Sequence, residues 1–248
     1  VCGWEHHLMP RLHHLVFLAL AILIGGPASR AQGGPAYLPV QPVERAVAPQ
    51  PENAGPRLSF TVNNSADAVD SNTGDSVCNI GDGTCTLRAA VMQAAASGAG
   101  PHSITIPAGA IIVLNVGGQN NPNPSSGDLD ILFELEISRA GPGVAPIISN
   151  TVDRIFEVHD GGSLTLSDLW LWKSGVPTSH GGAIAVSGGE FIGTNLQVLH
   201  NTGYAGGGIY VNNSPLFVLR NSFVGLNSAT TEGGGLASYF SSGEIVNS

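Results

Sequence analysis

The sequence predicts an all-β solenoid whose coils repeat about every 26 residues. Three observations lead to this prediction. Asp or Asn recurs in one phase, with spacings of 27, 26 and 26 residues, at Asp168, Asn195, Asn221 and Asn247. Gly-Gly pairs followed by small or aliphatic residues recur in step with them. The segments between are short alternating strands without long charged helical patterns, so we expect three short strands in each coil.

The recurring polar residues and glycines have a structural explanation. In stacked coils, the side-chain amide of an Asn donates to one neighbouring coil and accepts from the other, as in other stacked parallel strands. We therefore expect Asp168, Asn195, Asn221 and Asn247 to form a structural ladder. The Gly-Gly pairs are expected at sharp corners, where the backbone adopts conformations closed to other residues.

Stacking also explains the composition. The chain has 34 Gly in 248 residues and only 11% charged residues, against typical values near 7% and 25%. Equivalent residues of neighbouring coils lie about 4.8 Å apart, where two like charges repel by about 0.9 kcal/mol even in water. Charge must therefore be sparse. A net charge of -9 with nine Lys and Arg argues against a nucleic-acid partner.

Residues 1–31 are typical of a secretory signal peptide with an upstream extension. Basic and histidine residues precede the apolar run Leu15–Ile24, and a Gly-Gly-Pro sequence leads to a small-residue cleavage site ending at Ala31. Ten apolar residues are too few to cross a bilayer core of about 30 Å as a helix. We expect export to the extracellular space or cell surface and no membrane span in the mature chain. An uncleaved interfacial anchor is the alternative.

The remaining chain divides by composition. Residues 32–57 contain six prolines and almost no apolar periodicity, which is typical of a semi-rigid linker. Residues 58–103 are expected to cap the solenoid, and residues 104–248 to form its coils. Because the last coil stops within a repeat, we expect further β-helix coils beyond residue 248.

The expected cap combines a strand, a cysteine loop and a helix. Leu58–Val62 alternates as a strand does, and Thr86 can cap an Ala-rich helix that reaches Ala96. Since no other cysteine survives removal of the signal peptide, export makes Cys78 and Cys85 a predicted disulfide. Two free thiols or a metal-binding pair are the alternatives.

The segments 61–70, 74–78 and 85–91 resemble the CSLREA domain of bacterial exported β-helix proteins. Thr86 stands for the serine of that motif and Ala89 for its glutamate. The segments 127–131 and 154–158 continue the resemblance. It implies a secreted or surface-located right-handed parallel β-helix, in a family mostly without assigned chemistry. The Gly-Gly repeats also show a weaker likeness to polymorphic outer-membrane proteins.

Two candidate binding sites follow from the residues. Trp170 and Trp172 alternate with leucines, so both indoles are expected on one outer face, where they could stack on sugar rings or a partner protein. Asp70, Asn72 and Asp75 are spaced like the oxygen ligands of a calcium loop, but the usual terminal Glu is missing. A solvated turn is the alternative there, and we expect no other cofactor.

These features predict a non-enzymatic secreted or cell-surface module, adhesin-like or a structural stalk, with glycans or surface proteins as partners. The alternative is a polysaccharide lyase or glycoside hydrolase, which in the case of hydrolysis needs a pair of carboxylates. The pairs Asp128 with Asp130 and Glu134 with Glu136 have the spacing of residues on a solvated strand face. No catalytic residue is therefore predicted here, and those of an enzyme would lie beyond residue 248.

Overall fold

The computed structural model describes residues 57–118 and 122–248. These residues belong to one compact unit, which spans residues 49–248. The predicted signal peptide and all but the last residue of the predicted linker lie outside the described residues.

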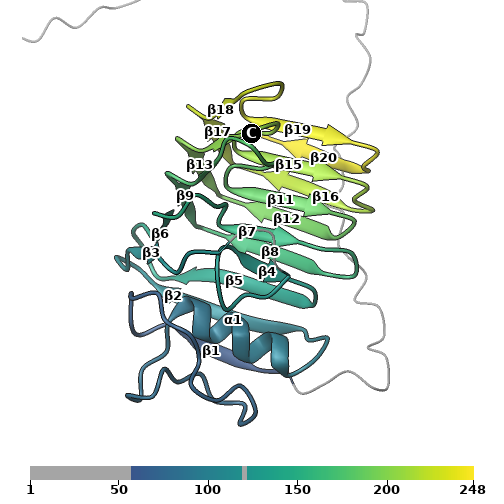
Figure 1. Cartoon of the computed structure of the whole chain (residues 1–248). Helices are drawn as coiled ribbons and strands as arrows, with labels where there is room; N and C mark the ends of the chain where they lie inside the picture. The colour runs from purple at the N-terminus through teal and green to yellow at the C-terminus, as the bar shows by residue number, and fades with distance from the viewer. Residues whose placement is uncertain (1–56, 119–121) are drawn as a thin grey trace, which may run out of the picture. The chain divides into compact units, whose positions relative to one another are not determined.

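The described chain is a parallel β-helix with an N-terminal cap, so the predicted class of fold is confirmed (Figure 1). All strand pairings are parallel, and strands far apart in sequence lie side by side in four sheets. Sheet A has seven strands: β1 (Ser59–Thr61), β2 (His102–Pro107), β5 (Glu134–Ala140), β8 (Ser163–Ser167), β12 (Glu190–Thr194), β16 (Phe217–Arg220) and β20 (Gly243–Val246).

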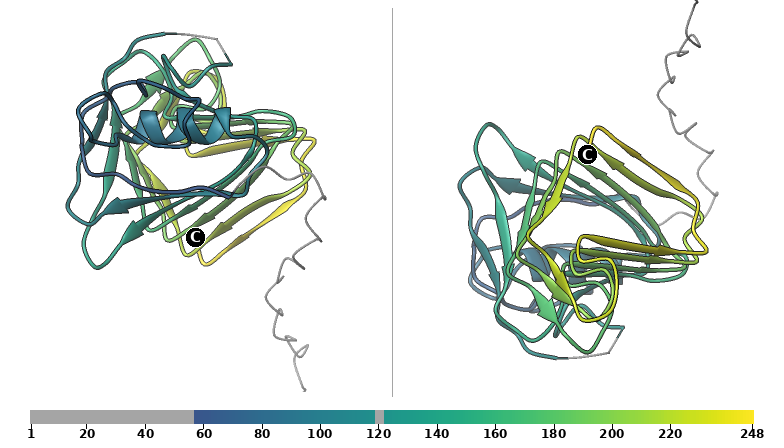
Figure 2. Two further views of the ribbon diagram at one scale, coloured as in Figure 1. Left: turned by 90° about the horizontal axis from the view of Figure 1, so that it is seen from below. Right: turned by 90° about the horizontal axis from the view of Figure 1, so that it is seen from above.

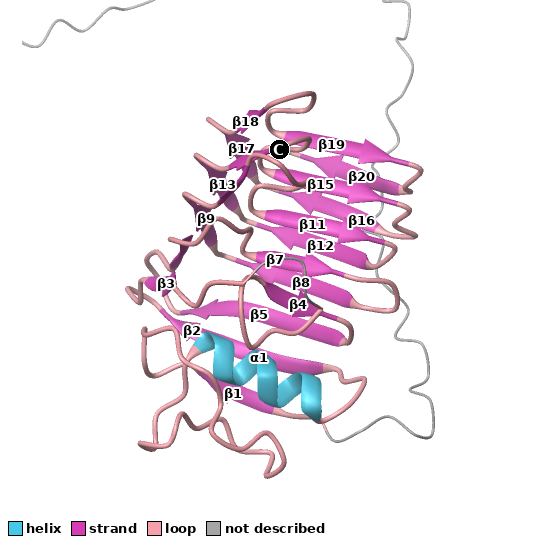
Figure 3. Cartoon of the chain, in the orientation of Figure 1, coloured by secondary structure: helices cyan, strands magenta, loops and turns pink. Residues whose placement is uncertain are grey.

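The other sheets form the remaining sides of the column (Figure 3). Sheet B contains β3 (Ile112–Leu114), β6 (Pro146–Ser149), β9 (Trp170–Trp172), β13 (Gln197–Leu199) and β17 (Phe223–Gly225). Sheet C contains β4 (Leu129–Ile131), β7 (Phe156–Val158), β11 (Ile184–Ser187), β15 (Ile209–Asn212) and β19 (Leu236–Tyr239). Sheet D contains three two-residue strands: β10 (Gly175–Val176), β14 (Thr202–Gly203) and β18 (Ser228–Ala229). The later coils therefore have a fourth short strand where the sequence predicted three.

The register of the strands matches the repeat read from the sequence. Ile184 pairs with Ile209, and Ile209 pairs with Leu236, so the residues that follow the Gly-Gly pairs lie directly above one another. Inward-facing residues stack in the same way, with Leu164, Phe191 and Phe217 in adjacent strands of sheet A. Phe191 is fully buried. One continuous hydrophobic core therefore runs along the column.

In the pairs Gly181-Gly182 and Gly206-Gly207, the glycines occupy corners that no larger residue fits. Gly206 has a φ of +62°, in the left-handed region that favours glycine. A Cβ atom on Gly207 would lie 2.2 Å from the carbonyl oxygen of Ser228 in the next coil. The first glycine thus supplies the backbone conformation and the second allows the coils to approach.

The recurring Asp and Asn residues lie at the corner between sheets A and B. All four have left-handed backbone, with φ values of 60° at Asp168, 54° at Asn195, 49° at Asn221 and 52° at Asn247. Side-chain hydrogen bonds link Asn195 to Asp168 at 3.2 Å and Asn247 to Asn221 at 3.3 Å. Asn tolerates this backbone conformation better than most residues, which is a second reason for its recurrence.

The cap closes one end of the column (Figure 2). β1 pairs with β2, and helix α1 (Leu87–Ala96) follows the N-cap Thr86, whose side chain accepts from the backbone N–H of Ala89. Leu87 and Val91 belong to the core cluster of the column. Cys78 and Cys85 form the predicted disulfide, which removes both alternatives of free thiols and a metal pair.

Among residues 57–118 and 122–248, no helix has the length and apolar character needed to cross a membrane.

Candidate functional site

The two tryptophans of β9 lie on the outer side of sheet B. Leu171 between them is fully buried, whereas Trp170 is 39% exposed and Trp172 is half-buried. Gln197 stacks on Trp170, and Phe223, which is 54% exposed, stacks on Gln197. The outer surface of sheet B formed by Trp170, Trp172, Gln197, Leu199 and Phe223 is called the sheet B stripe below.

Trp172 is held by its neighbours. The Lys173 ammonium nitrogen lies 4.8 Å from the centre of its ring, and the His200 ring lies 6.2 Å away. The indole nitrogen of Trp172 is buried without a hydrogen-bond partner. Trp170 therefore offers the more accessible face to a ligand.

The residues proposed from the sequence as calcium ligands cap backbone groups in their own loop. The two carboxylate oxygens of Asp70 accept from the backbone N–H groups of Asn72 and Asn79, at 2.8 and 3.0 Å. Asp75 accepts from the N–H of Val77 at 2.9 Å, and the Asn72 amide donates to the other Asp75 oxygen at 3.2 Å. These are the contacts of a hydrogen-bonded turn.

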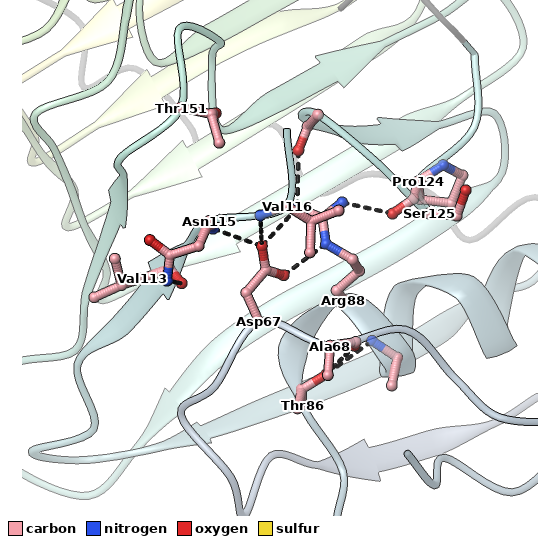
Figure 4. A network of polar contacts seen from close by, with 12 residues as sticks. Asp67, Ala68, Thr86, Arg88, Val113, Asn115, Val116, Pro124, Ser125 and Thr151 are labelled. Atoms are coloured by element: carbon pink, nitrogen blue, oxygen red, sulfur yellow. Dashed lines mark hydrogen bonds and ion pairs between the residues drawn. The ribbon is translucent and has the colours of Figure 1, made fainter. Parts of the chain in front are cut away.

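A buried ion pair that sequence reasoning missed joins the cap to the first coil (Figure 4). Arg88 on α1 and Asp67 in the preceding loop both have 0% exposed side chains and are 2.6 Å apart. Asp67 also accepts from the backbone N–H groups of Asn115 and Val116, at 2.6 and 2.7 Å. Arg88 donates to the carbonyl oxygens of Pro124 and Gly127. A charged residue in an Ala-rich helix was the sequence signal for this network.

A second buried charged group lies where sheet C begins. Asp128 and Asp130 are 2% and 0% exposed, so the expectation that they occupy a solvated strand face is wrong. Asp130 on β4 is the register partner of Glu157 on β7. The Nε2–H of His159, just after β7, donates to Oδ1 of Asp130 at 2.6 Å. The adjacent strands β4 and β7, and the corner after β7, therefore bring together three side chains of types that can bind a metal ion.

Arg154 is the cation of this group. Its Nε lies 3.1 Å from Oδ2 of Asp128, and its Nη1 lies 3.2 Å from Oε2 of Glu157. Arg154 Nε and Asp128 Oδ2 are close enough for an ion pair but are not aligned for a hydrogen bond. Both atoms are buried and neither has a hydrogen-bond partner. Asp153 contributes a further buried carboxyl group, 3.7 Å from the same Nε. This cluster thus contains more carboxyl groups than cations. Its members are Asp128, Asp130, Asp153, Arg154, Glu157 and His159.

Burial and these neighbours shift the proton affinities of the group. Burial raises the pKa of Asp128 to about 8, although the Arg154 guanidinium acts in the opposite direction. Burial also raises the pKa of Asp153. The hydrogen bond to Asp130 raises the pKa of His159 above its usual range. Perturbed groups of this kind concentrate at functional sites.

The geometry limits what this group can do. A protonated Asp128 could act as a general acid, but a glycosidic bond must reach both carboxyl groups that act on it. Asp128 and Asp130 are buried too deeply for that contact. Glu157 and His159, with side chains 20% and 26% exposed, form the accessible side of the group.

The sequence did contain a signal for this group. Asp130 and Glu157 are 27 residues apart, which is the period of the repeat, and each is flanked by aliphatic or aromatic residues. Two acidic residues at the repeat spacing must stack, and stacked like charges are the arrangement that a solenoid avoids.

Comparisons of this chain with protein-family models, with curated proteins and with solved structures gave no match.

Proposed function

We propose that this protein is a non-enzymatic secreted or cell-surface module, adhesin-like or a stalk, which displays a contact surface on a rigid β-helix column. The structure itself is a β-solenoid with a short helical cap. The disulfide between Cys78 and Cys85 supports export, since such bonds persist mainly in oxidising compartments. The apolar run Leu15–Ile24, with the small-residue cleavage site that ends at Ala31, supports the same location.

The sheet B stripe is the observation that carries this proposal. Trp170 and Phe223 remain substantially exposed on coils two apart, with Gln197 of the intervening coil between them, although burying a large aromatic side chain is favourable. Their strands belong to one hydrogen-bonded sheet, so the spacing of the rings is fixed by the backbone. Aromatic rings on a rigid surface bind sugar rings or partner side chains with little loss of conformational entropy.

The sheet B stripe is tested by binding of the full chain to immobilised glycans and to whole cells. The Trp170→Ala, Trp172→Ala double variant is expected to lose at least about tenfold in affinity, a loss of about 1.4 kcal/mol. Tyr204→Ala is the matched control, because Tyr204 is exposed to a similar degree but lies outside the stripe. Unchanged binding by the double variant would refute the proposed contact surface.

The second candidate function is a polysaccharide-active enzyme. The pKa of Asp128, which is raised to about 8, is the observation that favours it, and the burial of that carboxyl group away from a bound sugar argues against it. Release of new reducing ends or unsaturated sugars from acidic polysaccharides by the full chain would support this candidate. No turnover, together with glycan binding through the sheet B stripe, would support the non-enzymatic module.

A further inference from the structure

One group of side chains has the composition of a metal site. Among the described residues, Asp130, Glu157 and His159 each offer a ligand atom, and these three atoms lie within 4.8 Å of one another. We propose that these residues bind a divalent first-row transition ion, with Zn²⁺ as the best match. This site is distinct from the sheet B stripe, because its residues belong to sheet C and the corner that follows it.

The first argument is the stacking of two acidic residues. Asp130 and Glu157 are direct partners in adjacent parallel strands. The same column of sheet C continues with Ala185, Tyr210 and Ala237, none of which is acidic. Like charges in directly paired positions destabilise a sheet. A bound cation between the two carboxylates converts this repulsion into attraction.

The second argument is an oxygen atom without a partner. Asp130 is fully buried, and its Oδ2 has no hydrogen-bond partner. A buried carboxylate oxygen left in this state costs free energy, about 1–3 kcal/mol or more for a charged group. Coordination to a metal ion would satisfy it. The Oδ1 of the same carboxylate already contacts Nε2 of His159, so the group is directed at the other members of the site.

The ligand types select the class of ion. One imidazole with two carboxylates suits Zn²⁺ and related transition ions, whereas Ca²⁺ and Mg²⁺ prefer oxygen ligands alone. Ligand atoms about 2.1 Å from a tetrahedral ion are about 3.4 Å apart, so only small side-chain shifts are needed here. Three protein ligands leave a fourth position for water or another ligand.

The surroundings are rich in carboxyl groups. Asp128 and Asp153 place two further buried carboxyl groups beside the ligands, and Arg154 contacts both of them as well as Glu157. A single guanidinium therefore contacts three acidic residues, and Asp130 adds a fourth carboxyl group to the cluster. Glu157 and His159 are partly exposed, which gives an ion a route from solvent.

Isothermal titration of the full chain with ZnCl₂ tests the site. We expect Asp130→Asn and His159→Gln each to weaken one binding event by at least about tenfold, since the loss of even an outer-shell partner costs 10- to 100-fold. Asp160→Asn is the matched control, because Asp160 is adjacent and exposed, and it is expected to bind as the wild type does. Histidines 6, 7, 13 and 14 are common to all variants, so any Zn²⁺ they bind cancels in the comparison.

Circular dichroism establishes that each variant is folded, and the partly exposed Glu157→Gln replaces Asp130→Asn if the latter does not fold. Titrations with CaCl₂ and MgCl₂ provide the other arms. Equal Zn²⁺ binding by the wild type and all ligand variants would overturn the site. Tighter binding of Ca²⁺ or Mg²⁺ than of Zn²⁺ at this position would overturn the class of ion.

Discussion

The beginning of the column and its later coils are stabilised differently. At the beginning, single-copy charged residues are buried, as in the Arg88–Asp67 pair and in Arg154 with its acidic neighbours. In the later coils, neutral groups repeat and stack. Asn201 is fully buried, and its amide bonds both to the preceding coil, at Leu171, and to the following coil, at Asn227.

The difference follows from what each region must match. A later coil contacts two coils like itself, so one neutral residue type that donates and accepts serves every step. The first coil contacts a helix and irregular loops, whose backbone groups have no repeating partners. Long or charged side chains satisfy such groups individually, as Arg88 does for the carbonyl oxygens of Pro124 and Gly127. A functional site that occurs once in the molecule is therefore expected where the residues differ from the repeat pattern.

The largest expected loss of stability comes from breaking the buried ion pair at the N-terminal end of the column. Arg88→Met leaves the buried Asp67 carboxylate without its cation, which typically costs about 3–5 kcal/mol of unfolding free energy. Urea unfolding followed by circular dichroism measures this loss. The control is Arg220→Met, whose ion pair with Glu244 near the other end is about one third exposed. That change is expected to cost less than about 1 kcal/mol, and equal losses would contradict the contrast.

A smaller effect is expected from a neutral stacked residue. Asn201→Leu keeps most of the side-chain volume but leaves the N–H of Ser174 without its acceptor and removes the side-chain hydrogen bond to the carbonyl of Leu171. We expect a loss of about 2–3 kcal/mol in the same unfolding measurement. Asn150→Leu removes an exposed Asn–Asn contact to Asn115 and should change stability by less than about 0.5 kcal/mol. A similar loss in both variants would show that burial does not set the effect.

The pH dependence of the cap gives a third test. His102 is buried, its Nδ1 accepts from the N–H of Leu58, and burial lowers its pKa below 6.5. The unfolded chain therefore binds a proton at a higher pH than the folded chain does. The resulting loss of unfolding free energy is absent above about pH 6.5. It grows as the pH falls toward the pKa of His102 in the folded chain.

His102→Asn keeps an acceptor near the Nδ1 position. The variant should lack the pH-dependent part of the unfolding free energy that comes from His102. Unfolding free energies of the wild type and this variant are compared between pH 7.5 and 5. Their difference is expected to shift in favour of the variant as the pH falls. A difference that stays constant with pH would mean that His102 does not titrate differently in the two states.

The smallest effect separates two roles of the Asn ladder. Asn221 combines a φ of 49° with a side-chain contact to Asn247 that is exposed. Asn221→Gly keeps the left-handed backbone and removes the contact, so we expect a change of less than about 0.5 kcal/mol. Asn221→Ala should cost about 1 kcal/mol, since alanine is strained in this conformation. Equal destabilisation by both changes would mean that Asn221 stabilises the ladder through its side-chain contact and not through its backbone conformation.

Repetition decided what could be predicted from the sequence. The period of the Asn and Gly-Gly residues was visible, and it led to the stacked column and its corners. The disulfide followed from the number of cysteines. The partners of Arg88 lie 21 to 39 residues away in irregular loops, so no periodic signal marks them. The Asp130–Glu157 pair did carry the period, but a strand pattern alone does not show that Asp130 is fully buried.

Hydrogen exchange read by mass spectrometry on the wild type and Arg88→Met tests most directly the claim that buried charge stabilises the beginning and neutral stacking the later coils. The account predicts faster exchange in the variant for the amides of α1, β1 and β2, with protection retained in β12, β13, β15 and β16. Equal acceleration along the whole column, or acceleration confined to the later coils, would contradict it.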